Sequence, residues 1–142
     1  YPDGSFRPNA AITRAEFAAV AVRFGGADAF GVADAANFPD VADDHWAVGS
    51  IAAAALRGWV TGYPDGSFLP DSPITRAEAV TIINRISERV CDREFVDASD
   101  AITSFTDLTA EHWAYYGIME AANSHEYTRD TSGAERWLAL LD

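Results

Sequence analysis

Two arginines occupy positions where helices seldom carry a cation. Arg14 and Arg76 each follow a threonine in the motif I-T-R-A-E, which is predicted to open a helix. The helix dipole disfavours a cation in an exposed first turn by about 0.3–1 kcal/mol. A guanidinium beside free backbone amides can receive a carboxylate. It can equally form an ion pair with Asp3 or Asp65 in the preceding loop, or stay solvated, and the residues alone favour these structural interpretations.

The arginines belong to a sequence unit that occurs twice. Y-P-D-G-S-F-x-P precedes I-T-R-A-E at 1–16 and again at 63–78. Pro-Asp-Gly is a turn sequence, because proline presets φ, aspartate bonds its own backbone and glycine accepts a positive φ. Thr13 with Glu16, and Thr75 with Glu78, have the spacing of a capping box. Each unit is therefore predicted to be a shaped loop followed by a capped helix.

A second motif also occurs twice and precedes another helix in each case. It reads F-P-D-V-A-D-D-H-W-A from Phe38 and F-T-D-L-T-A-E-H-W-A from Phe105. Asp43 or Asp44 is the predicted N-cap of the first of these helices. The apolar stripes at helical spacing are Val48, Ile51, Ala52, Ala55 and Trp59 in the first copy, and Tyr115, Ile118, Met119 and Ala122 in the second. The run of alanines predicts a thin helix face that allows close packing.

The last part of the chain departs from this pattern. H-E-Y-T-R-D-T stands where Y-P-D-G-S-F is expected, although Ser132 and Glu135 keep the spacing of a capping box. Gly133 occupies the arginine position. We therefore predict a final short helix without the cation, and at most two competent sites. Arg129 or Arg136 could supply the missing charge, but no spacing requires it.

Composition narrows the classes of partner. The 142 residues are 49% hydrophobic and carry a net charge of −12, and all ten basic residues are arginine. Such a chain is a globular domain or a compact set of repeats, and its field repels nucleic acid and anionic membranes. No apolar run is long enough to insert in a membrane. Cys91 is single, so no intrachain disulfide is expected. Because the chain begins inside a motif, we expect sequence to precede it.

Catalysis and metal binding are weak interpretations of these residues. His45 and His112 are equivalent positions beside a predicted cap and a tryptophan, as expected of structural histidines. No nucleophile, zinc-protease or phosphate-loop motif is present. Each acidic loop supplies one carboxylate, whereas an EF-hand needs several alternating oxygen ligands. We predict no enzyme activity, no cofactor and no metal site, and a structural or protein-binding repeat without glycan binding stays an alternative.

The repeated motifs resemble the S-layer homology (SLH) family of bacterial surface proteins. The resemblance is carried by F-P-D-V from Phe38, by His45, Trp46 and Ala47, by Gly58, by G-Y-P-D-G-S-F-L-P from Gly62, and by I-T-R-A-E from Ile74. It implies an all-α fold of three repeats in a pseudo-threefold, with a central three-helix bundle, projecting second helices and ordered loops. The expected boundaries are 1–26 for the C-terminal half of repeat 1, 27–37 for a linker, 38–90 for complete repeat 2, 91–104 for a connector, and 105–142 for a shortened, divergent repeat 3.

The resemblance also implies a function. SLH modules anchor surface proteins non-covalently to the cell wall by binding secondary cell wall polysaccharide, typically pyruvylated, in grooves between repeats. It implies an extracellular location, and it makes the carboxylate interpretation of Arg14 and Arg76 the favoured one. The other implied ligand contacts are Asp3, Gly4, Ser5, Asp65, Gly66, Ser67, Trp46 and Trp113. Core packing is an equal alternative for the two tryptophans, and the incomplete repeats leave self-association open.

Overall fold

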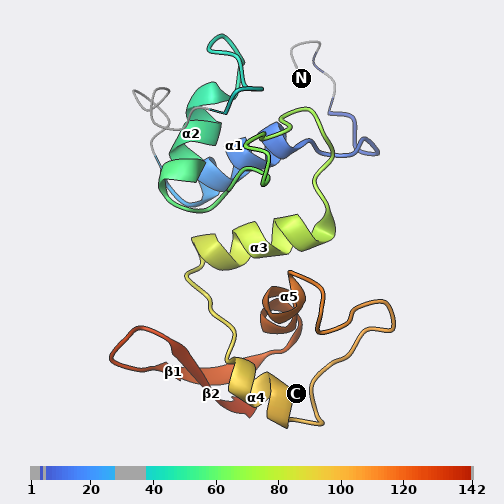
Figure 1. Ribbon diagram of the computed structural model, residues 1–142, viewed down its shortest axis with the longest axis vertical. Helices are drawn as coiled ribbons and strands as arrows, with labels where there is room; N and C mark the ends of the chain where they lie inside the picture. The colour runs from blue at the N-terminus through green and yellow to red at the C-terminus, as the bar shows by residue number, and fades with distance from the viewer. Residues whose placement is uncertain (1–3, 5, 28–37, 142) are drawn as a thin grey trace. The chain divides into compact units, whose positions relative to one another are not determined.

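The computed structural model describes residues 4, 6–27 and 38–141, which form two units, Tyr1–Ile74 and Thr75–Asp142 (Figure 1). The elements in chain order are α1 (Arg14–Phe24), α2 (Val48–Leu56), α3 (Arg76–Ile86), α4 (Arg93–Ala98), α5 (Tyr115–Ala122), β1 (His125–Arg129) and β2 (Glu135–Leu140). Asp3, Ser5 and nearly all of the predicted linker lie outside the described residues. Each unit combines a helix of the I-T-R-A-E type with the H-W-A type helix that follows it in the chain.

In the first unit, α1 and α2 pack through small side chains. Both predicted properties of these helices are confirmed: Thr13 and Glu16 form a capping box at the start of α1, and the alanine faces are buried. The buried residues of the two helices include Ala15, Ala18, Ala19, Ala21 and Val22 in α1, and Ile51, Ala52, Ala53 and Ala54 in α2. Short side chains allow the two helix backbones to approach closely.

The predicted cap of α2 is wrong. The helix begins at Val48, and its N-cap is Ala47, which has no capping side chain, so neither Asp43 nor Asp44 caps it. A histidine takes over part of this role, because Nδ1 of His45 accepts a hydrogen bond from the amide of Ala47 at 3.1 Å. His112 repeats the contact with Ala114 at 3.2 Å before α5. These bonds satisfy amides at the helix entrance and support the structural interpretation of both histidines.

The loop after α2 is fixed by two aspartates. Asp65 accepts hydrogen bonds from the amide and the hydroxyl of Ser67, at 2.9 and 2.7 Å, and these bonds lower its pKa. Asp40 accepts from the amides of Phe68 and Leu69, at 2.8 and 2.7 Å. Partial burial opposes ionisation of Asp40, but the amide hydrogen bonds outweigh it and lower the pKa. The loop therefore has a defined shape.

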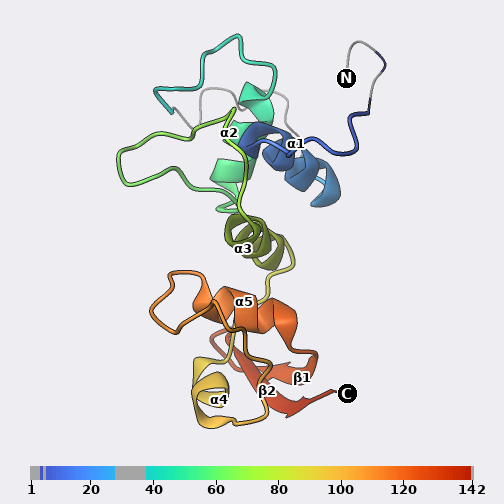
Figure 2. The ribbon, with the colours of Figure 1, turned by 90° about the vertical axis from the view of Figure 1, so that its right-hand side faces the viewer.

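In the second unit, α3 crosses α5 at a steep angle, and the hairpin and α4 lie on the opposite side of α5 (Figures 1 and 2). The capping box of Thr75 and Glu78 is present at the start of α3, as predicted. Asn84 on α3 donates from Nδ2 to the carbonyl of Gly117 at 2.8 Å. The core on the other face of α5 is formed by Val96, Met119 and Trp137.

The predicted polar connector at 91–104 contains a short helix. Asp92 caps α4 by accepting from the amide of Phe95 at 3.1 Å, and its second oxygen accepts from the amide of Trp137 at 3.1 Å. One carboxylate thus starts a helix and holds a strand beside it. Val96 is the buried residue of α4. A helix of six residues is too short to be stable by itself, so α4 depends on its packing against the rest of the unit.

The predicted final helix is also wrong, and the all-α expectation is therefore confirmed only in part. Residues 125–140 form an antiparallel hairpin in which His125 lies opposite Leu140 and Arg129 opposite Glu135. Asp130 accepts from the amide and hydroxyl of Ser132, and Gly133 takes φ +85°. An aspartate turn with a positive-φ glycine closes a hairpin. The fold is mainly helical with one small sheet.

No helix in the described parts of the chain is both long enough and apolar enough to cross a membrane.

The thiol of Cys91 is expected to react slowly. Burial, together with the nearby carboxylates of Glu120 and Asp92, raises its pKa to about 12. At pH 8 the thiolate fraction is then roughly a thousandfold lower than that of an ordinary cysteine, and the thiolate is the reactive form. Labelling with a chromogenic disulfide reagent should be slow in buffer and fast in denaturant. Equal rates in the two conditions would contradict this prediction.

Candidate functional site

Arg14 is almost buried and joins α1 to the loop of the next sequence unit. Its side chain is held by residues that follow α2: Nε donates to the carbonyl of Phe68 at 2.7 Å, and Nη2 donates to the carbonyl of Thr61 at 3.3 Å. The guanidinium carbon lies 4.6 Å from the ring centre of Tyr63 and 4.8 Å from that of Phe68. Arg14 is 6% exposed. It therefore holds the loop in place, and its contact with a ligand stays a prediction.

Arg76 has a different environment although its motif is identical. It is exposed in the first turn of α3, and within residues 4, 6–27 and 38–141 we find no hydrogen bond or ion pair of its side chain. The chain after α5 enters β1 at His125 instead of forming a Y-P-D-G-S-F loop. Arg76 consequently lacks the carbonyl groups that enclose Arg14. Its guanidinium is accessible to a carboxylate from solvent.

Trp46 and Trp113 are surface residues. They are 63% and 64% exposed, which rules out the core-packing alternative for both. Each indole lies beside the histidine that precedes it, with ring centroids 5.7 Å apart for His45 and 5.8 Å apart for His112. The two repeats therefore present the same exposed aromatic group. An exposed indole next to a polar ring is suited to stacking on a sugar face.

The loop residues predicted to meet a ligand are only partly described. Gly4 and Gly66 are both exposed, and both have a positive φ, at +77° and +85°. Asp65 forms the predicted Asx turn with Ser67, so its carboxylate has a structural role. Contacts of these residues with a ligand stay predictions.

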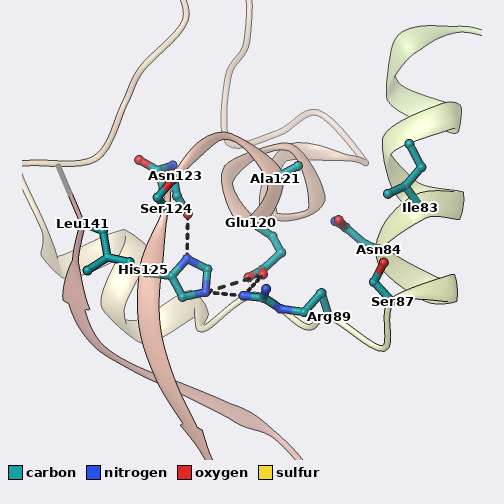
Figure 3. A pocket seen from close by; sticks show the side chains of 10 residues that line it. All are labelled: Ile83, Asn84, Ser87, Arg89, Glu120, Ala121, Asn123, Ser124, His125 and Leu141. Carbon is teal, nitrogen blue, oxygen red and sulfur yellow. Dashed lines mark hydrogen bonds and ion pairs between the residues drawn. The ribbon is translucent and has the colours of Figure 1, made fainter.

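A second cluster was missed from the sequence. Glu120, His125 and Glu135 meet the guanidinium of Arg89 beside a pocket of about 650 Å³. Figure 3 shows Arg89, Glu120 and His125 at the edge of this pocket. The pocket is lined by Ile83, Asn84, Ser87, Arg89, Glu120, Ala121, Asn123, Ser124, His125 and Leu141. Burial raises the pKa of Glu120, while the charge of Arg89 opposes that rise. These residues come from four separate segments, so the cluster cannot be predicted from local spacing in the sequence.

Comparison with known proteins identifies the family. Residues 1–18 and 37–80 match the S-layer homology domain. The cellulosome-anchoring protein of Acetivibrio thermocellus is 38% identical over 145 residues, which cover all of this chain and 31% of that protein. Cell surface glycoprotein 1 of the same organism is 42% identical over 119 residues, covering 80% of this chain and 5% of the relative. S-layer protein EA1 of Bacillus anthracis is 46% identical over 50 residues, or 35% of this chain and 6% of the relative.

The chain belongs to the S-layer homology family. It spans about a third or less of the length of these relatives. Arg14, Trp46 and Arg76 lie within the residues that match the family, whereas Trp113 lies outside them.

Proposed function

We propose that this module anchors its protein to the bacterial cell wall by binding an anionic, pyruvylated secondary cell wall polysaccharide. The S-layer homology family is one of non-enzymatic anchoring modules at the cell surface, so the chain acts outside the cell. The wall polysaccharide is the partner, and neither nucleic acid nor membrane insertion is involved.

The accessible guanidinium of Arg76 carries this proposal. A guanidinium binds a carboxylate through two parallel hydrogen bonds, which a lysine cannot reproduce. The adjacent helix N-terminus favours an anion further. Because the chain has a net charge of −12, an anionic polymer is repelled at long range and requires such a local cation. The ketal carboxylate of a pyruvylated sugar meets this requirement.

Sugar contacts come from residues that the two repeats share. We place the exposed rings of Trp46 and Trp113 against sugar faces, where aromatic stacking excludes water without demanding a charge. The turn amides of Gly66 and Ser67 are placed near sugar hydroxyls. Arg14 supports the loop and presents it to the glycan. The corresponding contacts of Asp3, Gly4, Ser5 and Asp65 complete the proposed set.

The proposal includes an arrangement of the repeats. We propose that the stretches 1–26, 38–90 and 105–142 follow the pseudo-threefold of the family, with α2 and α5 as first helices and α1 and α3 as projecting second helices. Glycan binds between neighbouring repeats. The hairpin in the third repeat replaces its ligand-binding loop, so that repeat contributes no arginine of the I-T-R-A-E type. Incomplete grooves could be completed by a second copy, which size measurement at the working concentration would detect.

Calorimetric titration with a purified wall-polysaccharide fragment tests the proposed site. Arg76→Ala is expected to weaken binding by at least roughly tenfold, about 1.4 kcal/mol, because the carboxylate loses a bidentate partner. Arg76→Lys should recover only part of this loss. Arg23→Ala is the matched control, since Arg23 is an exposed arginine in the last turn of α1.

Two outcomes would overturn the proposal. If Arg76→Ala bound the polysaccharide as tightly as the unaltered chain, the carboxylate contact would lie elsewhere. If the folded, unaltered chain produced no heat with the fragment, the alternative of a structural or protein-binding repeat would be favoured.

A further inference from the structure

Three side chains with metal-binding atoms converge in the second unit. The ligand atoms of Glu120, His125 and Glu135 all lie within 4.8 Å of one another. Glu120 is on α5, His125 begins β1 and Glu135 begins β2. All three side chains are at least 98% buried. Figure 3 shows the carboxylate of Glu120 and the ring of His125 pointing toward the same point beside the pocket.

The Nε2 lone pair of His125 accepts a hydrogen bond from the guanidinium that also pairs with the two carboxylates. Nδ1 of His125 lies 2.6 Å from the carbonyl oxygen of Asn123, which can only accept, so Nδ1 carries the proton. Nε2 lies 2.7 Å from Nη2 of Arg89, which can only donate. His125 is therefore neutral with Nε2 as the acceptor. A metal-binding histidine has this arrangement, in which the other ring nitrogen donates to a carbonyl.

The spacing of the ligand atoms is close to that of a zinc site. Nε2 of His125 lies 3.5 Å from Oε1 of Glu120 and 3.9 Å from Oε2 of Glu135. Tetrahedral bonds of about 2.0–2.1 Å place neighbouring ligand atoms about 3.3–3.4 Å apart. The histidine ring is held by stacking on Trp137, with centroids 3.6 Å apart and planes at 18°. Small side-chain movements would complete the geometry.

A guanidinium now occupies the cation position. Nη2 of Arg89 lies 2.8 Å from Oε1 of Glu120, and Nε lies 3.0 Å from Oε1 of Glu135. This cation does not satisfy the whole cluster: Oε2 of Glu120 and Nε1 of Trp137 are both buried without a hydrogen bond of good geometry, although the indole N–H still lowers the pKa of Glu120. Such an oxygen is costly unless a further donor or cation reaches it. Arg89 is 29% exposed and lines the pocket, so its side chain has space to withdraw.

We propose that Glu120, His125 and Glu135 form a Zn²⁺ site for which Arg89 is the competing internal cation. When the guanidinium moves into the pocket, Zn²⁺ takes its place and a water from the pocket completes a four-coordinate site. Two carboxylates balance the charge of the ion. An imidazole ligand favours zinc over calcium and magnesium, which prefer oxygen ligands throughout. The bound ion would join α5 to both strands of the hairpin.

Titration with ZnCl₂ against a chromophoric chelator tests this site in the metal-free chain. We expect one saturable site, and Co²⁺ should give the visible absorption of a tetrahedral centre. Arg89→Gln should tighten binding by at least roughly tenfold, because the competing charge is gone. Glu120→Gln should weaken it by at least roughly tenfold, because a charged ligand is lost. Glu126→Gln, exposed on β1, is the matched control and should bind like the unaltered chain.

The variants separate this site from zinc bound by surface histidines. An affinity unchanged in Glu120→Gln would assign the zinc to an adventitious surface site and overturn the proposal. Absence of saturable binding in both the unaltered chain and Arg89→Gln, each folded by circular dichroism, would overturn it as well. If Arg89→Gln does not fold, the comparison of the unaltered chain with Glu120→Gln and Glu126→Gln decides the question by itself.

Discussion

Replacement of Glu135 by alanine is expected to lower the free energy of unfolding of the second unit by about 3 kcal/mol or more. The carboxylate is fully buried, and it pairs with Arg89 at 3.0 Å and with Arg129 at 3.2 Å. Removing it leaves two cations without their shared partner. The same change removes the ion pair between β2 and the segment that follows α3, so the hairpin should keep its packing through Trp137 and the hydrogen bond to Asp92 as ties to the rest of the unit. Urea denaturation followed by far-UV circular dichroism measures the effect.

Glu94→Ala is the matched control for this change. The side chain of Glu94 is 88% exposed, and it lies 3.5 Å from Arg136. An exposed ion pair contributes little, so the control should change the free energy of unfolding by less than about 1 kcal/mol. Equal losses in Glu135→Ala and Glu94→Ala would show that the buried network does not hold the hairpin.

Replacement of Arg14 by alanine is expected to cost the first unit about 2–4 kcal/mol. The change leaves the buried carbonyl of Phe68 without its donor, which costs about 1–3 kcal/mol. It also removes the cation from the rings of Tyr63 and Phe68, worth about 1 kcal/mol. Arg14→Lys should recover little, because one ammonium cannot reach two carbonyls and cover two rings. Urea denaturation of the variant measures the loss.

Arg76→Ala separates stability from binding. Arg76 is exposed, so its replacement should change the free energy of unfolding by no more than about 0.5 kcal/mol. Glycan affinity should nevertheless fall. If Arg14→Ala and Arg76→Ala had equal effects on stability, the two arginine environments described above would be wrong.

Local motifs predicted the local structure of the repeats well. The two capping boxes, the Asx turn at Asp65 and the thin alanine faces follow from neighbouring residues, and the structure contains all of them. The spacing of Ser132 and Glu135 predicted a helix, but the same spacing also suits a strand that follows a turn. Asp130 and Gly133 form the turn that favours the hairpin. The alternating burial of the first four residues of β2 agrees with a strand.

Properties that depend on distant segments could not be predicted. Arg14 and Arg76 share one motif, yet one is enclosed and the other exposed, because different structures follow α2 and α5. The cluster around Glu120 joins residues from α5, both strands and the segment after α3. No spacing in the sequence brings these four segments together. The expectation that no metal site exists followed from local spacing and did not include this cluster.

The affinity of the unaltered chain for a pyruvylated wall-polysaccharide fragment and for the same fragment after removal of pyruvate tests the central claim most directly. Both glycans share every sugar contact, so the difference isolates the carboxylate. We predict that calorimetric titration will give at least roughly tenfold weaker binding to the depyruvylated fragment, with the difference abolished in Arg76→Ala. Equal affinities of the unaltered chain for the two fragments would contradict the proposal that this module recognises the ketal carboxylate.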